Sequence, residues 1–235
     1  MKVLFDKIAR YATITSEQED VNYPAVNLAH QYATVYYKST SFDDVITMMF
    51  DDQRPVNSIF FTYSNASSMT VKLYQWDGEL LDTITVDCSH ASGSAYFDEQ
   101  LVRWAVIEAS APVTEDLRIG SIELGVAKDF PLPTANFVPV YESKSTMEES
   151  DQGQVSFQYI EPRKKYVTKY QGVVKETYLE VLEMFKPVDR GHIWVDITEE
   201  DHNVYLPLYC VTNLIENGER VEDRVSFTLT ITEAK

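Results

Sequence analysis

The stretch that decides the fold of this chain is Tyr23-Pro24-Ala25-Val26-Asn27-Leu28. Pro24 fixes its own φ angle and pushes Tyr23 towards extended backbone, because the proline ring clashes with a helical residue before it. The Asn27 side chain can hydrogen-bond to nearby backbone groups. We therefore expect a rigid loop that leads into a strand and clamps one end of a β-sandwich.

Two segments with strand patterns follow this loop. The run Val45–Phe50 is apolar on both faces, which is typical of a central strand in a covered sheet. Asp51–Pro55 then predicts a turn of the chain. Beyond it, Ile59, Phe61 and Tyr63 alternate with other residues and indicate a second strand.

A hairpin is the clearest local feature of this part of the chain. Thr70–Trp76 and Leu80–Val86 flank Asp77-Gly78, a pair that suits a tight turn between antiparallel strands. Further strands are expected at Leu101–Glu108 and Arg118–Val126. Tight turns at such short intervals favour a β-sandwich.

The strand patterns stop at residues 127–134, where Pro131 and Pro133 stand among polar neighbours and predict an extended connector. A chain of 235 residues is long enough for two domains. We therefore expect a β-sandwich over residues 1–126, a linker at 127–134 and a second, β-rich domain over 135–235.

The second domain is expected to combine strands with one short helix. Residues 137–141 predict a strand, and residues 142–152 predict a mobile acidic loop. The stretch Lys175–Phe185 places its apolar residues at helical spacing, so we expect an amphipathic helix there.

The last segment predicts a second hairpin. Leu208–Ile215 and Val221–Ile231 flank Asn217-Gly218, which favours a type I′ turn. Polar and apolar residues alternate along the second strand. The apolar set is Val225, Phe227, Leu229 and Ile231, and the polar set is Ser226, Thr228 and Thr230. We expect the hairpin to lie along a sheet edge or subunit boundary, with Ser226, Thr228 and Thr230 as an assembly face.

The charge of the chain limits its partners. Twenty Lys and Arg residues stand against 37 Asp and Glu residues, which gives a formal net charge of −17. A surface this acidic repels phosphate groups, so we expect no nucleic-acid partner.

Neither export nor a membrane span is expected from the sequence. No segment approaches the roughly 18 uninterrupted apolar residues of a membrane helix, and the first residues lack the apolar core of a secretory signal. Cys88 and Cys210 fall in different expected domains and indicate buried, reduced thiols rather than a disulfide.

Candidate metal and catalytic sites are weakly supported. His192, Trp194 and Asp196 would share one face of a strand and could hold a metal or a sugar, but a strand face of mixed polarity is the simpler interpretation. Glu199–Asn203 lacks the spaced oxygens and the glycine of a calcium loop, which favours a solvated turn. The chain contains no nucleophile elbow, P-loop or dinucleotide pattern. We expect no enzymatic activity, no cofactor and no metal.

The aromatic residues allow two interpretations. Their rings could stack on a sugar, or they could fill the sandwich core and a subunit interface, and the second interpretation is favoured because large aromatic area is usually buried. The set in question is Tyr32, Tyr36, Tyr37, Tyr63, Tyr74, Trp76 and Trp104.

Taken in order, these motifs resemble the galactose-binding-like, or discoidin-type, jelly-roll domains, and more narrowly the version at the N-terminus of bacteriophage tail proteins. The motifs that carry the resemblance are Tyr23–Leu28, Tyr37-Lys38-Ser39, Ser64-Asn65 and the strand Ile119–Gly125. Arg and His are usual in the family where this chain has Lys38 and Ser64.

The resemblance covers roughly residues 3–126 and implies roles for particular residues. It implies a structural loop, which could also contact a ligand, formed by Tyr23, Pro24, Asn27, Lys38, Ser39 and Asn65. It also implies an extended lead-in over the first residues, where Phe5–Ala12 has helical periodicity as an alternative.

The function implied by the resemblance is that of a non-enzymatic structural component of a phage tail, tail tip or baseplate. Such a protein would form a homo-oligomer, bind other tail proteins, and reside in the virion tail after assembly in the host cytoplasm. The main alternative is a carbohydrate-binding adhesin module for host-surface glycan, and a third is the accessory subunit of a hydrolase. An assembly protein should oligomerise, whereas an adhesin should bind glycan as an isolated monomer.

Overall fold

The structure is a computed structural model that describes residues 2–30, 35–129, 140–142, 146–149, 155–158, 163–185, 192–196, 208–221 and 224–233. The chain forms two compact units. The first comprises Met1–Phe130 and Trp194–Leu208, and the second comprises Pro131–Ile193 and Tyr209–Lys235.

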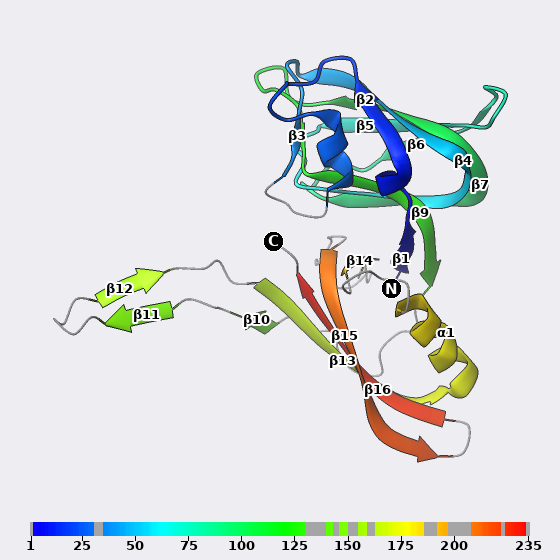
Figure 1. The fold of residues 1–235 in the computed structure, drawn as a ribbon, viewed down its shortest axis with the longest axis vertical. Coiled ribbons are helices and arrows are strands. Elements are labelled where there is room, and N and C mark those ends of the chain that lie inside the picture. The colour runs from blue at the N-terminus through cyan, green and yellow to red at the C-terminus, as the bar shows by residue number, and fades with distance from the viewer. Residues whose placement is uncertain are drawn as a thin grey trace. The chain divides into compact units, whose positions relative to one another are not determined.

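The first unit is built from antiparallel strands with two short 3₁₀ helices (Figure 1). Its elements, in chain order, are β1 (Lys2–Lys7), η1 (Ala9–Tyr11), β2 (Ala12–Ser16), η2 (Ala25–Ala29), β3 (Tyr37–Lys38), β4 (Asp43–Thr62), β5 (Ser68–Tyr74), β6 (Leu80–Val86), β7 (Gly93–Ser110), β8 (Arg118–Ile119) and β9 (Ser121–Asp129). Strand β14 (His192–Asp196) pairs antiparallel with β1.

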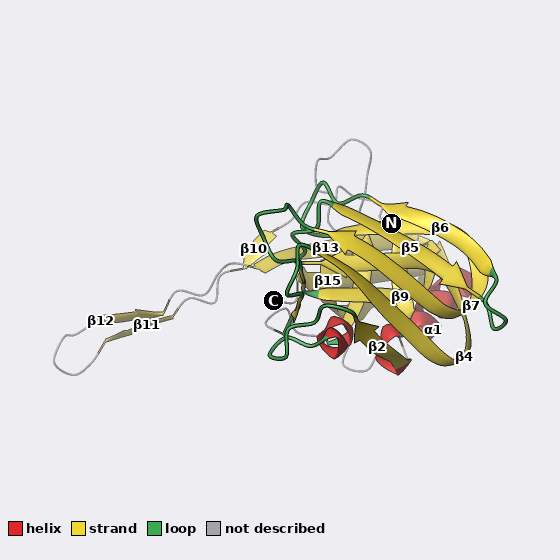
Figure 2. Ribbon diagram, turned by 90° about the horizontal axis from the view of Figure 1, so that it is seen from above, coloured by secondary structure: helices red, strands yellow, loops and turns green. Residues whose placement is uncertain are grey.

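Two long strands, β4 and β7, organise this unit. The first half of β4 pairs with β2 and with the second half of β7, which continues to β5 and β6. The second half of β4 pairs with β9 and with the start of β7, and β9 continues to β1. Figure 2 shows β4, β5, β6 and β7 lying side by side. The β4–β7 register shifts between Met49 and Arg54 and again between Val56 and Ser58, and such irregularities bend a strand.

A single hydrophobic core lies between the two halves of the long strands. Ile46 and Phe50 come from the first half of β4, and Ile59 and Phe61 come from the second half. All four belong to one cluster of buried residues, and their side chains are fully inaccessible to solvent. The expected fold is confirmed: the chain is mostly β, with a jelly-roll sandwich followed by a β-rich part with one short helix.

The expected turn at Asp51–Pro55 is wrong. β4 runs through it from Asp43 to Thr62, because the chain bends by a register shift and keeps its pairing with β7. The expectation of a strand covered on both faces is also wrong. Val45 and Thr47 are half-buried and Met49 is 48% exposed, so only alternate residues of Val45–Phe50 face the core.

Other expectations for the first unit agree with the structure, in full or in part. The Asp77-Gly78 hairpin is confirmed, with Gly78 at a φ of +89°. Residues 2–7 form β1, so the extended interpretation of the lead-in is correct for that part, and η1 follows. β9 continues to Asp129, so the expected linker begins inside a strand, and its remaining residues lie outside the described ones.

The second unit contains β10 (Val140–Glu142), β11 (Thr146–Glu149), β12 (Val155–Gln158), β13 (Arg163–Val174), α1 (Lys175–Phe185), β15 (Leu208–Val221) and β16 (Arg224–Glu233). The expected helix is confirmed at Lys175–Phe185. β11 and β12 form an antiparallel pair, so part of the expected acidic loop at residues 142–152 is a strand. Residues 137–139 of the expected strand lie outside the described part of the chain.

Phe227 is the centre of packing in the second unit. Its ring stacks on that of Tyr170, with the ring centroids 4.6 Å apart, and lies 5.4 Å from the ring of Tyr178 on α1. Phe227 is fully buried, and both tyrosines are buried as well. The alternation along β16 is confirmed: Val225, Phe227, Leu229 and Ile231 are buried, whereas Ser226, Thr228 and Thr230 are half-buried.

Two details of the expected C-terminal hairpin are wrong. β16 pairs with β13 on one side and with β15 on the other, so β16 is not an edge strand. The chain does not reverse at Asn217-Gly218 either. β15 continues to Val221, which pairs with Arg224, and the register shifts between Glu216 and Arg220. A bulge takes up the extra residues that were expected to form the turn.

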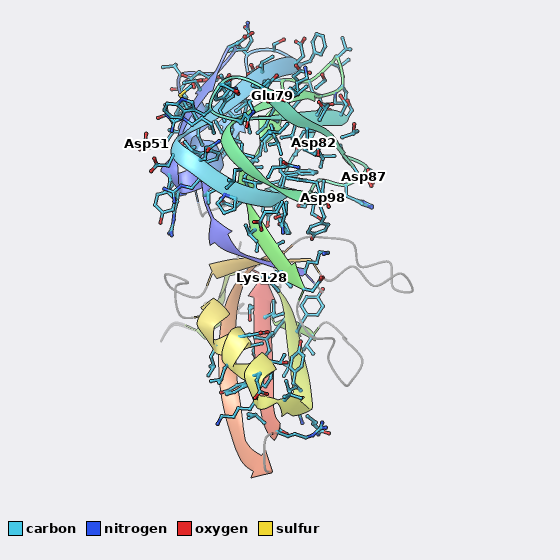
Figure 3. All side chains as sticks on the ribbon, turned by 90° about the vertical axis from the view of Figure 1, so that its right-hand side faces the viewer. Asp51, Glu79, Asp82, Asp87, Asp98 and Lys128 are labelled. Atoms are coloured by element: carbon cyan, nitrogen blue, oxygen red, sulfur yellow. The ribbon has the colours of Figure 1, made fainter. Side chains whose placement is uncertain are left out.

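The outside of the first unit carries dispersed carboxylates. Figure 3 labels Asp51, Glu79, Asp82, Asp87 and Asp98, which project from its surface. Asp82 is half-buried and the other four are exposed. Within the described residues, no helix is long and apolar enough to cross a membrane.

Replacement of Phe227 by Ala should destabilise the second unit by about 3 to 5 kcal/mol, because it leaves a cavity between β13, β16 and α1. Thermal and chemical denaturation of the full chain would measure this loss. Val167→Ala on β13, where the side chain is 47% exposed, is the matched control and should change stability by less than about 0.5 kcal/mol. Equal effects of the two substitutions would contradict the packing role of Phe227.

Candidate functional site

The motif residues expected from the sequence come together in the first unit. The Lys38 amide donates to the carbonyl oxygen of Tyr23 at 3.1 Å, and Lys38 lies opposite Arg118 in the β3–β8 pair. The Arg118 amide in turn donates to Asn65 Oδ1 at 2.8 Å. We call the group Tyr23, Tyr36, Lys38, Tyr63, Asn65 and Arg118 the loop surface.

The Tyr23–Leu28 segment forms the base of this loop surface. Pro24 has a φ of −67° and a ψ of 161°, and η2 begins directly after it. Asn27 Nδ2 donates to the Tyr36 carbonyl oxygen at 2.9 Å, which joins η2 to the segment that leads into β3. Ala25 and Leu28 are fully buried. Pro24 and Asn27 therefore hold the loop in place.

Two tyrosine rings stack at this surface. The ring centroids of Tyr23 and Tyr36 are 4.6 Å apart, with an angle of 19° between the ring planes. The side-chain hydrogen bond between them and partial burial raise the pKa of the Tyr36 phenol. Both residues are half-buried.

Asn65 and Lys38 fix the loop before β8. Asn65 Nδ2 donates to the Asp116 carbonyl oxygen at 3.0 Å and to Glu115 Oε2 at 3.1 Å. Lys38 Nζ forms an ion pair with Asp116 Oδ2 at 2.9 Å, and the hydrogen bond to that carboxylate raises the pKa of the lysine. Asn65 uses both ends of its amide inside the protein, so it positions its neighbours.

Ser39 is buried and structural. Its amide donates to the Leu117 carbonyl oxygen at 2.9 Å, and its hydroxyl donates to the Gln18 carbonyl oxygen at 3.2 Å. The same hydroxyl oxygen accepts the Ser41 amide at 3.0 Å. Ser39 can therefore influence a ligand only indirectly, by holding the loops that it joins.

Tyr63 and Arg118 are the exposed members of the loop surface. Tyr63 is 43% exposed and has a φ of +51°, a backbone conformation that is uncommon for residues with a side chain. Gly120 makes this conformation possible, since a Cβ there would lie 2.8 Å from Tyr63 Cβ and 2.9 Å from the Thr62 carbonyl oxygen. Strain of this kind is often found at functional sites. No sequence pattern indicates this strain, because Tyr63 fits the alternation of a strand.

A buried polar network lies beneath the loops, and the sequence analysis missed it. The Tyr37 hydroxyl donates to Asp44 Oδ2, and the Ser16 hydroxyl donates to the same oxygen at 2.7 Å. Asp44 Oδ1 accepts the Val45 amide at 2.7 Å. Burial, followed by the Asp44 hydrogen bond, raises the pKa of the Tyr37 phenol. The available signal was the carboxylate of Asp44 at the start of an apolar strand.

The structure does not describe the side chains of the other sequence candidates. His192, Trp194 and Asp196 lie in β14 as expected for a strand, but their side chains are outside the described part, as is all of Glu199–Asn203. Among the residues that the structure describes, no group of three His, Cys, Asp or Glu side chains could hold a metal ion. Burial, with a smaller effect of Asp87, raises the pKa of the Cys88 thiol to about 11.

The aromatic set was expected to fill the sandwich core or a subunit interface, and among its described members only Tyr37 is buried in the core. Tyr37 is buried, but Trp76 is 67% exposed and Tyr63 is 43% exposed. Tyr36, Tyr74 and Trp104 are half-buried, and Tyr32 lies outside the described residues. Several large rings therefore lie at the surface of the first unit.

Comparisons with solved structures find similar chains at low sequence identity. A chitosan-binding module from a chitosanase/glucanase of a Paenibacillus species is 14% identical, with a TM-score of 0.45, and the match covers 52% of this chain and 99% of the module. A family 32 carbohydrate-binding module from C. perfringens NanJ, in complex with galactose, is 14% identical, with a TM-score of 0.45 and coverage of 55% and 100%. The lectin domain of lectinolysin, complexed with Lewis B antigen, is 11% identical, with a TM-score of 0.45 and coverage of 51% and 95%. No family model and no curated protein matches the chain.

Replacement of Tyr37 by Phe should destabilise the first unit by about 1 to 3 kcal/mol, because a buried carboxylate loses a hydrogen-bond donor. Tyr11→Phe, at a ring that is 49% exposed, is the matched control and should have little effect. Chemical denaturation at neutral pH would compare the two variants.

The same variant tests the protonation state of Tyr37. Because the folded-state pKa is raised, the phenol contributes its full stability below the unfolded value of about 10 and loses it as the pH rises further. The stability difference between the wild type and Tyr37→Phe should therefore shrink from about pH 10 upward. A difference that grows with pH would contradict a neutral Tyr37.

Proposed function

We propose that the chain is a non-catalytic carbohydrate-binding protein whose first unit takes glycan at the loop surface. This is the adhesin alternative of the sequence analysis rather than the phage-tail interpretation. The observations that carry it are an exposed Tyr63 with a positive φ and an exposed Arg118 whose backbone amide is held by Asn65.

The chemistry of these two side chains suits a sugar. A tyrosine ring offers a flat apolar face and a polar hydroxyl, which match the carbon face and the hydroxyl rim of a pyranose. An arginine guanidinium has several donors in a planar fork that can bond two neighbouring hydroxyl oxygens. Tyr63 supplies the stacking surface and Arg118 supplies the directional bonds.

The rigidity of the frame supports binding rather than rearrangement. Asn65 holds Arg118 through its backbone amide, and Lys38 holds the preceding loop through Asp116. Gly120 leaves room for the strained backbone of Tyr63. A ligand that meets groups already in place loses less affinity to ordering them.

The first test is saccharide binding by variants of the loop surface. Arg118→Ala should lower affinity for a bound glycan at least tenfold in calorimetric titration, which corresponds to about 1.4 kcal/mol. Lys128→Ala removes an exposed cation on β9 and should leave affinity unchanged.

The panel for this test is a glycan array of neutral, amino and acidic sugars, followed by titration of the best binders. Products should be analysed as well, because turnover of a bound glycan would contradict the non-catalytic part of the proposal. If no saccharide binds at millimolar concentration, the binding function itself fails.

A second candidate is the assembly function in a phage tail, with other tail proteins or further copies of this chain as partners and the virion tail as location. The half-buried row of Ser226, Thr228 and Thr230 on β16 favours it, because hydroxyl side chains can pair with a neighbouring chain while the opposite face packs under α1. We place the assembly function second because β16 is paired on both sides and is therefore not an edge strand.

The assembly candidate predicts that Thr228→Glu leaves the melting temperature unchanged and reduces the mass of any oligomer in light scattering. Thr13→Glu, on an exposed position of β2, is the control for added charge. If the wild type is monomeric, or if its oligomer tolerates Thr228→Glu, the row on β16 is not an assembly face.

A further inference from the structure

The outward face of the β2–β4–β7–β5–β6 sheet carries a row of large apolar side chains. Tyr74 pairs with Trp104 across β5 and β7, and Trp104 pairs with Met49 across β7 and β4. Leu80 on β6 lies opposite Tyr74 and completes the row. Met49 is 48% exposed and Leu80 is 49% exposed. Residues next to this row in sequence, such as Leu73, Met48 and Ala105, are buried, so the row itself faces away from the core.

The rings in this row are ordered relative to one another. The ring centroids of Tyr74 and Trp104 are 5.4 Å apart, and their planes are inclined by only 13°. Trp76 lies beyond them at the start of the Asp77-Gly78 turn, where the Arg103 guanidinium lies 4.7 Å from its ring centroid. Trp76 remains 67% exposed although it has this contact. Tyr74 and Trp104 are half-buried and Trp76 is exposed, so part of the aromatic area at this end of the sheet is accessible to solvent.

A cleft of about 550 Å³ opens farther along the same face. Its lining includes Thr70, Glu108 and Val45, which stand directly opposite one another on β5, β7 and β4. Each lies four residues along its strand from the aromatic row, so all point to the same side of the sheet. Four residues of strand span about 13 Å, which exceeds one pyranose ring and suits a short oligosaccharide.

The cleft is polar and acidic. Glu17, Asp43 and Glu108 bring carboxylates to it, and Ser68, Ser110 and Thr70 bring hydroxyl groups. Lys72 lies between the aromatic row and the cleft, and its ammonium group is paired with the carboxylate of Glu108. The hydroxyl and carboxylate oxygens around the cleft can accept hydrogen bonds from sugar hydroxyls. The negative charge of the carboxylates repels uronic, sialic and sulfated sugars.

We propose that this sheet face is a second glycan site, which takes a linear oligosaccharide of neutral or amino sugars along β5 and β7. At one end of the oligosaccharide, a sugar ring stacks on Tyr74, Trp76 and Trp104. At the other end, the sugar hydroxyls donate hydrogen bonds to Thr70 and to the carboxylates of the cleft. The site shares no residue with the loop surface and does not depend on it.

The experiment uses the full chain with linear β-1,4-linked tetrasaccharides of glucose, N-acetylglucosamine, glucosamine, mannose and xylose, their monosaccharides, and tetragalacturonate as the anionic probe. Tryptophan fluorescence and calorimetry report binding, because stacking on Trp76 or Trp104 alters tryptophan emission. We expect at least one neutral or amino tetrasaccharide to bind at least tenfold more tightly than its monosaccharide, and tetragalacturonate to bind most weakly.

Three variants separate this site from the loop surface. Trp104→Ala and Trp76→Ala should each weaken tetrasaccharide binding at least tenfold, whereas Arg118→Ala should leave it unchanged. Asp43→Asn should reduce the difference in affinity between neutral and anionic tetrasaccharides. Asp98→Asn, at an exposed position near the start of β7, is the control and should leave this difference unchanged. Thermal melting confirms that each variant is folded.

Three results would overturn the proposal. In the first, tetrasaccharides bind no better than monosaccharides. In the second, Arg118→Ala abolishes tetrasaccharide binding and Trp76→Ala does not, so that the loop surface is the only glycan site. In the third, no tetrasaccharide binds and Trp76→Ala converts a dimer into a monomer in sedimentation, so that the face joins two copies of this chain.

Discussion

The pairing of β4 with β7 is the constraint on which the first unit depends. Both strands are long enough to take part in two halves of the sandwich, and their register shifts let them bend without losing their partners. Each half then places its buried residues in one core, from Ile46 and Phe50 on one side to Ile59 and Phe61 on the other. Without this shared pair, the two halves would present separate apolar faces to water.

The same pair fixes both candidate sites. The first half of β4 and the second half of β7 carry Met49 and Trp104 outward on the open sheet face. The far end of β4 leads directly into Tyr63, where the chain leaves the sheet with a positive φ. Because the core side chains hold these strands in register, the exposed side chains stand on a fixed backbone.

The polar residues around the loop surface have two different roles. Asn27, Ser39 and Asn65 satisfy backbone groups of neighbouring loops, which would otherwise stay unpaired at the end of a sandwich. Tyr63 and Arg118 stand on that frame and remain exposed.

Several local features are predictable from short stretches of the amino-acid sequence. The Asp77-Gly78 hairpin, the helix Lys175–Phe185 and the alternation along β16 follow from turn chemistry and side-chain period, which act over a few residues. The mostly β class also follows from these periods. The Pro24 and Asn27 loop was predictable for the same reason, because both residues act on the backbone beside them.

Only the tertiary structure decided which strands continue, which side chains meet and which rings stay exposed. Asp51–Pro55 has the composition of a turn, yet long-range pairing with β7 keeps it in β4. Asn217-Gly218 suits a tight turn, but burial of Phe227 and its neighbours sets a register that moves the reversal beyond Val221. Tyr63 and Trp104 are of residue types that are usually buried, yet Tyr63 is exposed and Trp104 is half-buried. Their positions follow from pairings between segments far apart in the chain, which no local pattern contains.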